Sequence, residues 1–357
     1  MSGKAYLILE NGAIFEGKSF GAQGDVTGEI VFTTGMTGYL ETLTDQSYHG
    51  QIVLQTFPLI GNYGVIPPDF ESAKVGARAY IVKHPCYNPS NFRSEKNLDT
   101  FLKESGTIGL YGIDTRALTK IIRKNGVMNG KITSSPPTEK DRAEAKAYTV
   151  VNAVASVSSR NVSKVGSGSR RIALMDFGAK RGIANALAAR DCEVWLFPHD
   201  TKAAEILKIK PHGIMLSNGP GDPAEPANKA IVETIQALMK SGITVFGICL
   251  GHQLMALANG YKTRKLKFGH RGANQPVKEI KTGGVYITSQ NHGYEVIADV
   301  SGRDASSFIN VNDGSCEGLD YGNSFSVQFH PEACGGPLDS SFLFDRFMER
   351  INKNASK

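Results

Sequence analysis

One stretch of the chain, residues 243–257, combines a short apolar run, a cysteine between two glycines and a second apolar run. The first run is rich in β-branched residues and predicts a buried strand, and the second is expected to be a helix. Gly247 and Gly251 flank Cys249 with the spacing of a nucleophile elbow that carries cysteine in place of serine. Small neighbours suit so sharp a strand-to-helix turn. The sulfur is therefore expected at a helix amino terminus, where unpaired N–H groups favour a thiolate.

The length and composition favour two ordinary domains and exclude several classes of protein. At 357 residues and 41% apolar content, the chain can bury two cores. The formal net charge of +6 is spread without a basic block, so we expect no nucleic-acid partner. No apolar run approaches about 20 residues, which predicts no membrane span. The first residues contain no signal-peptide core, and we expect a cytoplasmic protein.

The cysteines are odd in number and scattered, which indicates a reducing compartment without structural disulfides. They are Cys86, Cys192, Cys249, Cys316 and Cys334. No Cys-x-x-Cys pair or Cys/His cluster has the spacing of metal ligands, so we expect no metal site and no cofactor in this chain.

A change of pattern divides the chain. Residues 5–34 alternate apolar and polar positions, which predicts short strands of a half-exposed sheet. A capped amphipathic helix is predicted over residues 114–124, and a polar helix over residues 136–148. Residues 156–170 are rich in serine and glycine and lack periodicity. We therefore expect a first domain at 1–150, a linker at 151–170 and a second domain at 171–357.

After the linker, strands alternate with helices, which predicts an α/β domain with a doubly wound, mostly parallel sheet. The expected strands are 171–176, 192–197, 213–216 and 243–248, and the expected helices are 180–190, 202–208, 226–241 and 342–352. The predicted fold is thus an N-terminal mixed β/α domain followed by this doubly wound domain.

A cysteine nucleophile needs a base, and the base needs a group that orients it. His330 is the strongest candidate base, because it follows a predicted strand and precedes Pro331, which favours extended backbone. In extended chain, side chains two residues apart lie on the same face, so Glu332 can orient the imidazole. His330 and Cys249 then meet at the carboxyl edge of the sheet, where such folds place their sites.

His252 is a weaker candidate for the base. It lies three residues after Cys249 on the expected helix, where packing or local capping is the simpler interpretation.

Acyl transfer also needs donors for a developing oxyanion. The N–H of Leu250, directly after the cysteine, is the expected first donor. The glycine- and proline-rich loop 217–223 follows a predicted strand and is a candidate for the second donor; alone, it also fits an ordinary loop between strand and helix.

Four motifs taken together resemble those of class I (triad) glutamine amidotransferases, over about residues 171–350. They are Gly-Ile-Cys249-Leu-Gly-His-Gln, Ser217-Asn-Gly-Pro-Gly-Asp-Pro, Ser289-Gln-Asn-His-Gly-Tyr294 and Gln328-Phe-His-Pro-Glu332. Further segments extend a resemblance to the small, glutamine-hydrolysing subunits of carbamoyl-phosphate synthetases over nearly the whole chain. They are Thr37-Gly-Tyr39, Asp45-Gln-Ser-Tyr48, Gly61-Asn62, Gly112-Ile-Asp-Thr-Arg116, Asp176-Phe-Gly-Ala-Lys-Arg181 and Gly269-His-Arg-Gly-Ala-Asn274.

The resemblance implies a role for each matching residue. Cys249 would be the nucleophile, His330 the acid and base, and Glu332 its partner. Gly221 and Leu250 would be backbone donors to the oxyanion. Glutamine would be held by Ser47, Gly219, Gly221, Leu250, Gln253, Asn291, Gly293 and Tyr294. The family often has phenylalanine at the position of Tyr294. Residues 291–294, without the other motifs, also fit a hairpin turn.

The resemblance also implies a partner. The chain contains no G-x-x-x-x-G-K-[ST] motif, so ATP and Mg²⁺ are expected on a large synthetase subunit that receives ammonia from this chain. The first domain is the expected docking surface, in a heterodimer or a higher assembly of heterodimers. The carbamoyl phosphate would serve arginine or pyrimidine synthesis.

Three other interpretations remain open. The glutaminase component of another synthase, such as anthranilate synthase, fits the second domain but often lacks the first. A catalytically inactive scaffold would be free to lose part of the Cys/His/Glu set, which is complete here. A serine-hydrolase-like enzyme with cysteine at the elbow would place its acid before the histidine, whereas Glu332 follows His330.

Overall fold

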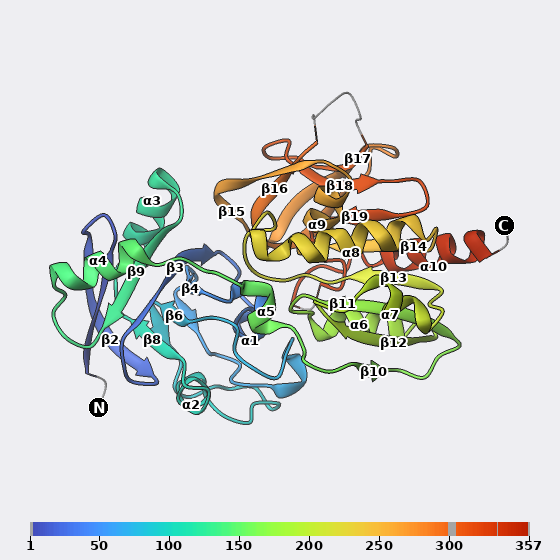
Figure 1. Ribbon diagram of the computed structural model, residues 1–357. Coiled ribbons are helices and arrows are strands. Elements are labelled where there is room, and N and C mark those ends of the chain that lie inside the picture. The colour runs from blue at the N-terminus through green and yellow to red at the C-terminus, as the bar shows by residue number, and fades with distance from the viewer. Residues whose placement is uncertain (1–2, 299–304, 334, 356–357) are drawn as a thin grey trace. The chain divides into compact units, whose positions relative to one another are not determined.

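The structure is a computed structural model that describes residues 3–298, 305–333 and 335–355. The chain divides into two compact units, Met1–Val150 and Val151–Lys357 (Figure 1). Four of the cysteines, Cys86, Cys192, Cys249 and Cys316, are free thiols, and Cys334 lies outside the described residues. Within the described part of the chain, no helix is both long and apolar enough to cross a membrane.

The first unit is built on a sheet that closes into a barrel. In order around the barrel its strands are β1 (Lys4–Leu9), β2 (Ile14–Gly21), β8 (Ile108–Tyr111), β6 (Ala79–Val82), β4 (Gln51–Gln55), β3 (Val26–Thr33) and β9 (Met128–Thr133). The first part of β2 keeps the alternating exposure that its sequence predicts, whereas β6 is buried throughout. Closure was not expected from the sequence, because it depends on pairings between strands far apart in the chain, such as β1 with β9.

Short helices surround the barrel. They are α1 (Tyr39–Thr44), α2 (Leu98–Glu104), α3 (Thr115–Asn125) and α4 (Glu139–Ala147), with 3₁₀ turns η1 (Gln46–Tyr48) and η2 (Pro67–Asp69) and a small sheet of β5 (Leu59–Ile60) and β7 (His84–Pro85). The predicted caps are confirmed for α3, since the Asp114 carboxylate accepts from the Ala117 N–H at 2.9 Å and Gly126 follows the last turn. The predicted polar helix is α4, which begins at a capping box between Thr138 and Asp141.

The second unit contains a ten-stranded sheet whose centre is parallel. Its order is β10 (Ser163–Val165), β12 (Cys192–Pro198), β11 (Arg170–Asp176), β13 (Gly213–Leu216), β14 (Thr244–Ile248), β19 (Phe325–Val327), β18 (Cys316–Asp320), β16 (Val285–Ile297), β15 (Lys262–Glu279) and β17 (Ser306–Asn310). The strands from β12 to β19 in this order pair in parallel, as predicted. The strands beyond β19, gold to orange in Figure 1, pair antiparallel.

Helices cover both faces of the parallel strands, so the sheet is doubly wound. The helices of this unit are α5 (Ala153–Val157), α6 (Arg181–Ala188), α7 (Ala203–Lys208), η3 (Pro226–Asn228), α8 (Lys229–Lys240), α9 (Leu250–Ala258) and α10 (Phe342–Ala355). Along β11, Ile172 and Leu174 pack with side chains of α6 and α10. Ala173 and Met175, between them, pack with side chains of α7, α8 and α9. This alternation, buried on both sides, explains the nearly continuous apolar sequence of the central strands.

The long strand β15 was not predicted. Its first half is rich in lysine and arginine and is almost entirely exposed or half-buried, so the sequence lacks the apolar alternation that marks a strand. Pairing with β16 holds it in place instead, through a register that shifts between Lys265 and His270.

The expected linker, residues 151–170, is part of the second unit. It contains α5 and β10, and β10 pairs antiparallel with β12. Its serines are engaged as well, since the Ser159 N–H donates to the Asp176 carboxylate at 2.8 Å and Ser158 accepts from the His199 N–H at 3.0 Å. Residues 151–170 thus have the composition of a loop, although specific hydrogen bonds hold them at the edge of the sheet.

The core around α10 makes a stability prediction. Leu343 is fully buried beside Phe246, whereas Leu338 on the same segment is 68% exposed. Leu343→Ala should lower the free energy of unfolding of the second unit by about 2–5 kcal/mol, because it leaves a cavity. Leu338→Ala, the matched control, should change it by less than about 0.5 kcal/mol. Trp195 is the only tryptophan, so its fluorescence during urea unfolding reports on this unit alone.

Candidate active site

Cys249 lies in the turn between β14 and α9, and its backbone is strained. Its φ of 54° and ψ of −105° are unusual for a residue with a side chain. The two flanking glycines are required by space, because a Cβ on Gly247 would lie 2.7 Å from the Gly251 carbonyl oxygen. A Cβ on Gly251 would collide with the carbonyl of Leu216. The predicted nucleophile elbow is thus present, with the sulfur at the amino end of α9.

The loop 217–223 lies against this elbow. The Gly251 N–H donates to the Ser217 carbonyl oxygen at 3.0 Å. A Cβ on Gly219 would lie 2.8 Å from Leu250 Cδ2. Residue 219 must therefore be glycine-sized for the loop to lie this close to α9. Gly221 has a φ of 92°, which favours glycine. Leu250 is the first residue of α9, so its N–H precedes the helix's own hydrogen-bond ladder.

His330 and Glu332 follow β19 and form a buried pair. His330 Nδ1 lies 2.6 Å from Glu332 Oε1, and the two side chains are 1% and 0% exposed. Because a carboxylate accepts, Nδ1 carries the proton and Nε2 is left to face a reacting atom. The His330 N–H donates to the Ser289 carbonyl at 2.9 Å, and the Cys249 N–H donates to the Val327 carbonyl at 2.9 Å. Three strands therefore bring the predicted triad together.

A lysine lies beside this pair. Lys180 Nζ is 3.5 Å from Glu332 Oε1, and its side chain is 9% exposed. Burial, the largest influence, and the Lys180 charge both lower the pKa of His330, but Glu332 and Cys249 outweigh them and raise it above its ordinary value. Burial raises the pKa of Glu332, but the charges of His330 and Lys180 dominate and hold it below its ordinary value.

Three of the residues expected to hold glutamine within this unit are linked to the sulfur or to one another. Cys249 Sγ lies 3.7 Å from the Asn291 carbonyl oxygen. Gln253 on α9 donates to the Tyr294 carbonyl oxygen at 2.8 Å and to Gln328 Oε1 at 2.9 Å. The segment that contains Asn291, Gly293 and Tyr294 is the interior of β16. The hairpin turn considered as an alternative for residues 291–294 is therefore wrong.

Ser47 belongs to the first unit, in the 3₁₀ turn η1. It is 8% exposed, and its N–H donates to the Asp45 carboxylate at 2.8 Å. Its contact with glutamine stays a prediction.

His252 is not placed to act as the base. Its Nδ1 lies 2.8 Å from Ser326 Oγ, and the ring is completely buried within the second unit. Burial lowers the pKa of His252 to about 3, so it remains neutral in the core.

Sequence reasoning named no role for Lys180, Ser289 or Gln328, although all three lie within the motifs quoted. Lys180 lies four residues beyond Asp176, the carboxyl end of β11, at the sheet edge where the site was expected, and that position is a usable signal. The Ser289 bridge to His330 depends on strand pairing across 41 residues of chain, for which the sequence has no local signal.

Comparisons with known proteins agree over both units. Residues 7–132 match the family "Carbamoyl-phosphate synthase small chain, CPSase domain", and residues 173–350 match "Glutamine amidotransferase class-I". A carbamoyl phosphate synthase small chain of Fusobacterium nucleatum is 49% identical over 98% of each chain. One from Clostridium perfringens is 49% identical over 97% of this chain and 99% of its own. A pyrimidine-specific small chain of Bacillus subtilis is 47% identical over 98% of this chain and 96% of its own.

The charges around His330 predict pKa shifts of opposite sign in two variants. Lys180→Met removes a neighbouring cation and should raise the pKa of His330, whereas Glu332→Gln removes the anion and should lower it, each by about one pH unit or more. The measurement is an NMR titration of the His330 imidazole, assigned by its loss in His330→Asn. Shifts in the same direction for both variants would contradict this arrangement.

Proposed function

The chain belongs to the carbamoyl-phosphate synthase small chains, and from this premise we propose that it hydrolyses L-glutamine at Cys249 and delivers the ammonia to a large synthetase subunit. It is an enzyme component with a class I glutamine amidotransferase domain. The observation that carries the proposal is the buried His330–Glu332 pair beside the strained Cys249 elbow.

The first half of the reaction forms a thioester. The Cys249 thiolate attacks the side-chain amide carbon of glutamine, and the carbonyl becomes a tetrahedral oxyanion. The backbone N–H groups of Leu250 and Gly221 stabilise that charge. His330 donates a proton to the leaving nitrogen, the C–N bond breaks, and ammonia departs.

The second half releases glutamate. His330, now neutral, accepts a proton from water as the oxygen attacks the thioester carbon. The carbon–sulfur bond then breaks, which restores the thiolate beside the imidazolium, and the new carboxyl group loses its proton to solvent to give glutamate. Glu332 keeps the proton on Nδ1 throughout, so that Nε2 performs each transfer.

Most of the proposed glutamine contacts lie in the second unit. Gly219, Gly221 and Leu250 would surround the reacting amide, with further contacts from α9 and β16, where Gln253, Asn291, Gly293 and Tyr294 lie. Backbone contacts at Tyr294 would survive the replacement of phenylalanine by tyrosine. Ser47 is a further proposed contact to the substrate.

The proposed partner is the large subunit of the synthetase, in a heterodimer or a higher assembly, with the first unit as docking surface. ATP and Mg²⁺ would be used there, and this chain would need no cofactor for glutamine hydrolysis. The carbamoyl phosphate would serve pyrimidine or arginine synthesis; the Bacillus subtilis relative is named pyrimidine-specific. The cytoplasmic location stays a prediction.

Replacement of the nucleophile tests the proposal. In the complex with a large subunit from a close relative, Cys249→Ser should lower glutamine-dependent carbamoyl phosphate synthesis at least about 10³-fold, because serine is a far weaker nucleophile here. Synthesis from added ammonium should be retained. Cys316→Ser, a matched control at another buried cysteine, should retain both activities. Normal glutamine use by Cys249→Ser would refute the assignment.

A covalent intermediate is a second expectation. Acid quenching during turnover with glutamine, followed by peptide mass spectrometry, should place a glutamyl adduct on the peptide that contains Cys249. An adduct on the Cys86 or Cys316 peptide instead would contradict the mechanism.

A further inference from the structure

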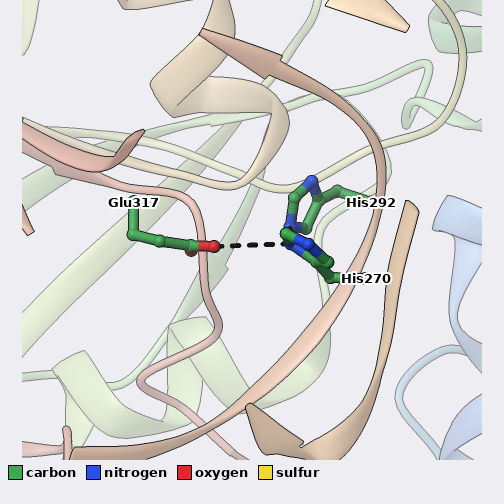
Figure 2. Close-up of side chains that lie close together, drawn as sticks. All are labelled: His270, His292 and Glu317. Carbon is green, nitrogen blue, oxygen red and sulfur yellow. Dashed lines mark hydrogen bonds and ion pairs between the residues drawn. The ribbon is translucent and has the colours of Figure 1, made fainter. Parts of the chain in front are cut away.

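Three side chains that the triad does not use converge within the second unit. His270 lies on β15, His292 on β16 and Glu317 on β18, and Figure 2 shows the Glu317 carboxylate pointing at the two imidazoles. One nitrogen of each histidine and one carboxylate oxygen all lie within 4.8 Å of one another. The three residues are far apart in sequence, so no motif with the spacing of metal ligands indicates this cluster.

The distances fit a small divalent ion. His270 Nδ1 lies 3.2 Å from His292 Nε2 and 3.5 Å from Glu317 Oε1. Tetrahedral ligands with bonds of about 2.1 Å to zinc are about 3.4 Å apart. The set therefore needs little movement to close around one ion.

The outer nitrogen of each imidazole is fixed by an acceptor. His270 Nε2 lies 2.8 Å from Asp313 Oδ2, and His292 Nδ1 lies 2.8 Å from the Tyr294 carbonyl oxygen. Because these oxygens only accept, both outer nitrogens carry protons. In the neutral rings the inner nitrogens, His270 Nδ1 and His292 Nε2, then present lone pairs. Carboxylate and carbonyl partners of this kind are typical of histidines that bind metals.

Oxygen atoms of Glu317 and Gln290 also lie near the inner nitrogens of the two imidazoles. The carboxylate of Glu317 is 0% exposed, and its two oxygens accept from Asn310 Nδ2 at 3.1 Å and Gln290 Nε2 at 3.0 Å. The other amide atom of Gln290, Oε1, lies 2.9 Å from His292 Nε2. Two nitrogen lone pairs and two oxygens thus face one point, an arrangement that a positive charge stabilises.

We propose that His270, His292 and Glu317 bind a divalent transition-metal ion of the zinc class, with Gln290 Oε1 or water as the fourth ligand. Two imidazoles and one carboxylate are a ligand set that suits Zn²⁺. In the absence of the ion, a proton between the two imidazoles can fill the same place, and metal binding releases it. The expectation of no metal site rested on local sequence spacing, whereas these ligands meet only through strand pairing.

The ion has a structural role. It ties β15, β16 and β18 together, and it holds the strand on which Asn291 contacts the Cys249 sulfur. It does not depend on glutamine hydrolysis, so binding can be measured whether or not the proposed activity is present.

The triad is a second place where zinc can bind, since it also offers a thiol, an imidazole and a carboxylate. The test therefore uses the full chain with Cys249→Ser in every sample. After chelator treatment, calorimetric titration with Zn²⁺ should give one equivalent bound with micromolar or tighter affinity. Co²⁺ as a probe should give tetrahedral or five-coordinate d–d bands without a thiolate charge-transfer band.

Substitution of the ligands locates the ion. His270→Asn and Glu317→Gln should each weaken Zn²⁺ binding at least about 100-fold, and Asp313→Asn, at the outer position, about 10-fold. His212→Asn, an exposed histidine of the same unit, is the matched control and should bind normally. Zn²⁺ should raise the midpoint of thermal unfolding of the parent and the control, but not of the two ligand variants.

Several outcomes would overturn the proposal. They are no binding at 100-fold excess over micromolar protein, binding that survives in both ligand variants, or binding that is lost with His330→Asn but kept with Glu317→Gln. Because Asp313→Asn alters a partly exposed side chain, it tests the site even where a ligand variant fails to fold.

Discussion

The strained backbone of Cys249 is the constraint on which the second unit depends. A positive φ at a residue with a side chain costs about 1–3 kcal/mol and persists only where its surroundings hold it. Here both neighbouring strands contribute, because the loop after β13 and the end of β19 accept hydrogen bonds from Gly251 and Cys249. In this turn the sulfur lies beside β16, 3.7 Å from the Asn291 carbonyl oxygen. The small residues of the elbow and of the loop 217–223 follow from that requirement.

The candidate site spans the parallel and the antiparallel part of one sheet. Cys249 and His330 follow the parallel strands β14 and β19, whereas Asn291 and Tyr294 lie on β16 in the antiparallel part. Beside the strand pairing of β19 with β18, hydrogen bonds join the two parts at the site: the His330 N–H bonds to Ser289, and Gln253 bonds to Tyr294.

What could be predicted from sequence followed from local rules. Apolar runs of β-branched residues located the central strands, Asp114 and Gly126 bounded α3, and the motif around Cys249 located the turn between β14 and α9. The barrel closure, β15 and the placement of residues 151–170 could not be predicted, because each depends on a partner strand distant in the chain. For the same reason, the contact of Lys180 with Glu332 could not be predicted, because the two residues are distant in sequence. The same holds for the cluster of His270, His292 and Glu317.

Lys180 affects the charge balance of the proposed site, and through it the release of product. In the proposed mechanism the buried charges cancel at the start, as thiolate with imidazolium and Glu332 with Lys180. They cancel again in the thioester, where sulfur and imidazole are both neutral and the lysine–glutamate pair remains. Only the finished glutamate adds a carboxylate with no counter-charge among these four groups, and an uncompensated charge in a buried site costs several kcal/mol. Electroneutrality thus favours retention of the amide substrate and expulsion of the acid product.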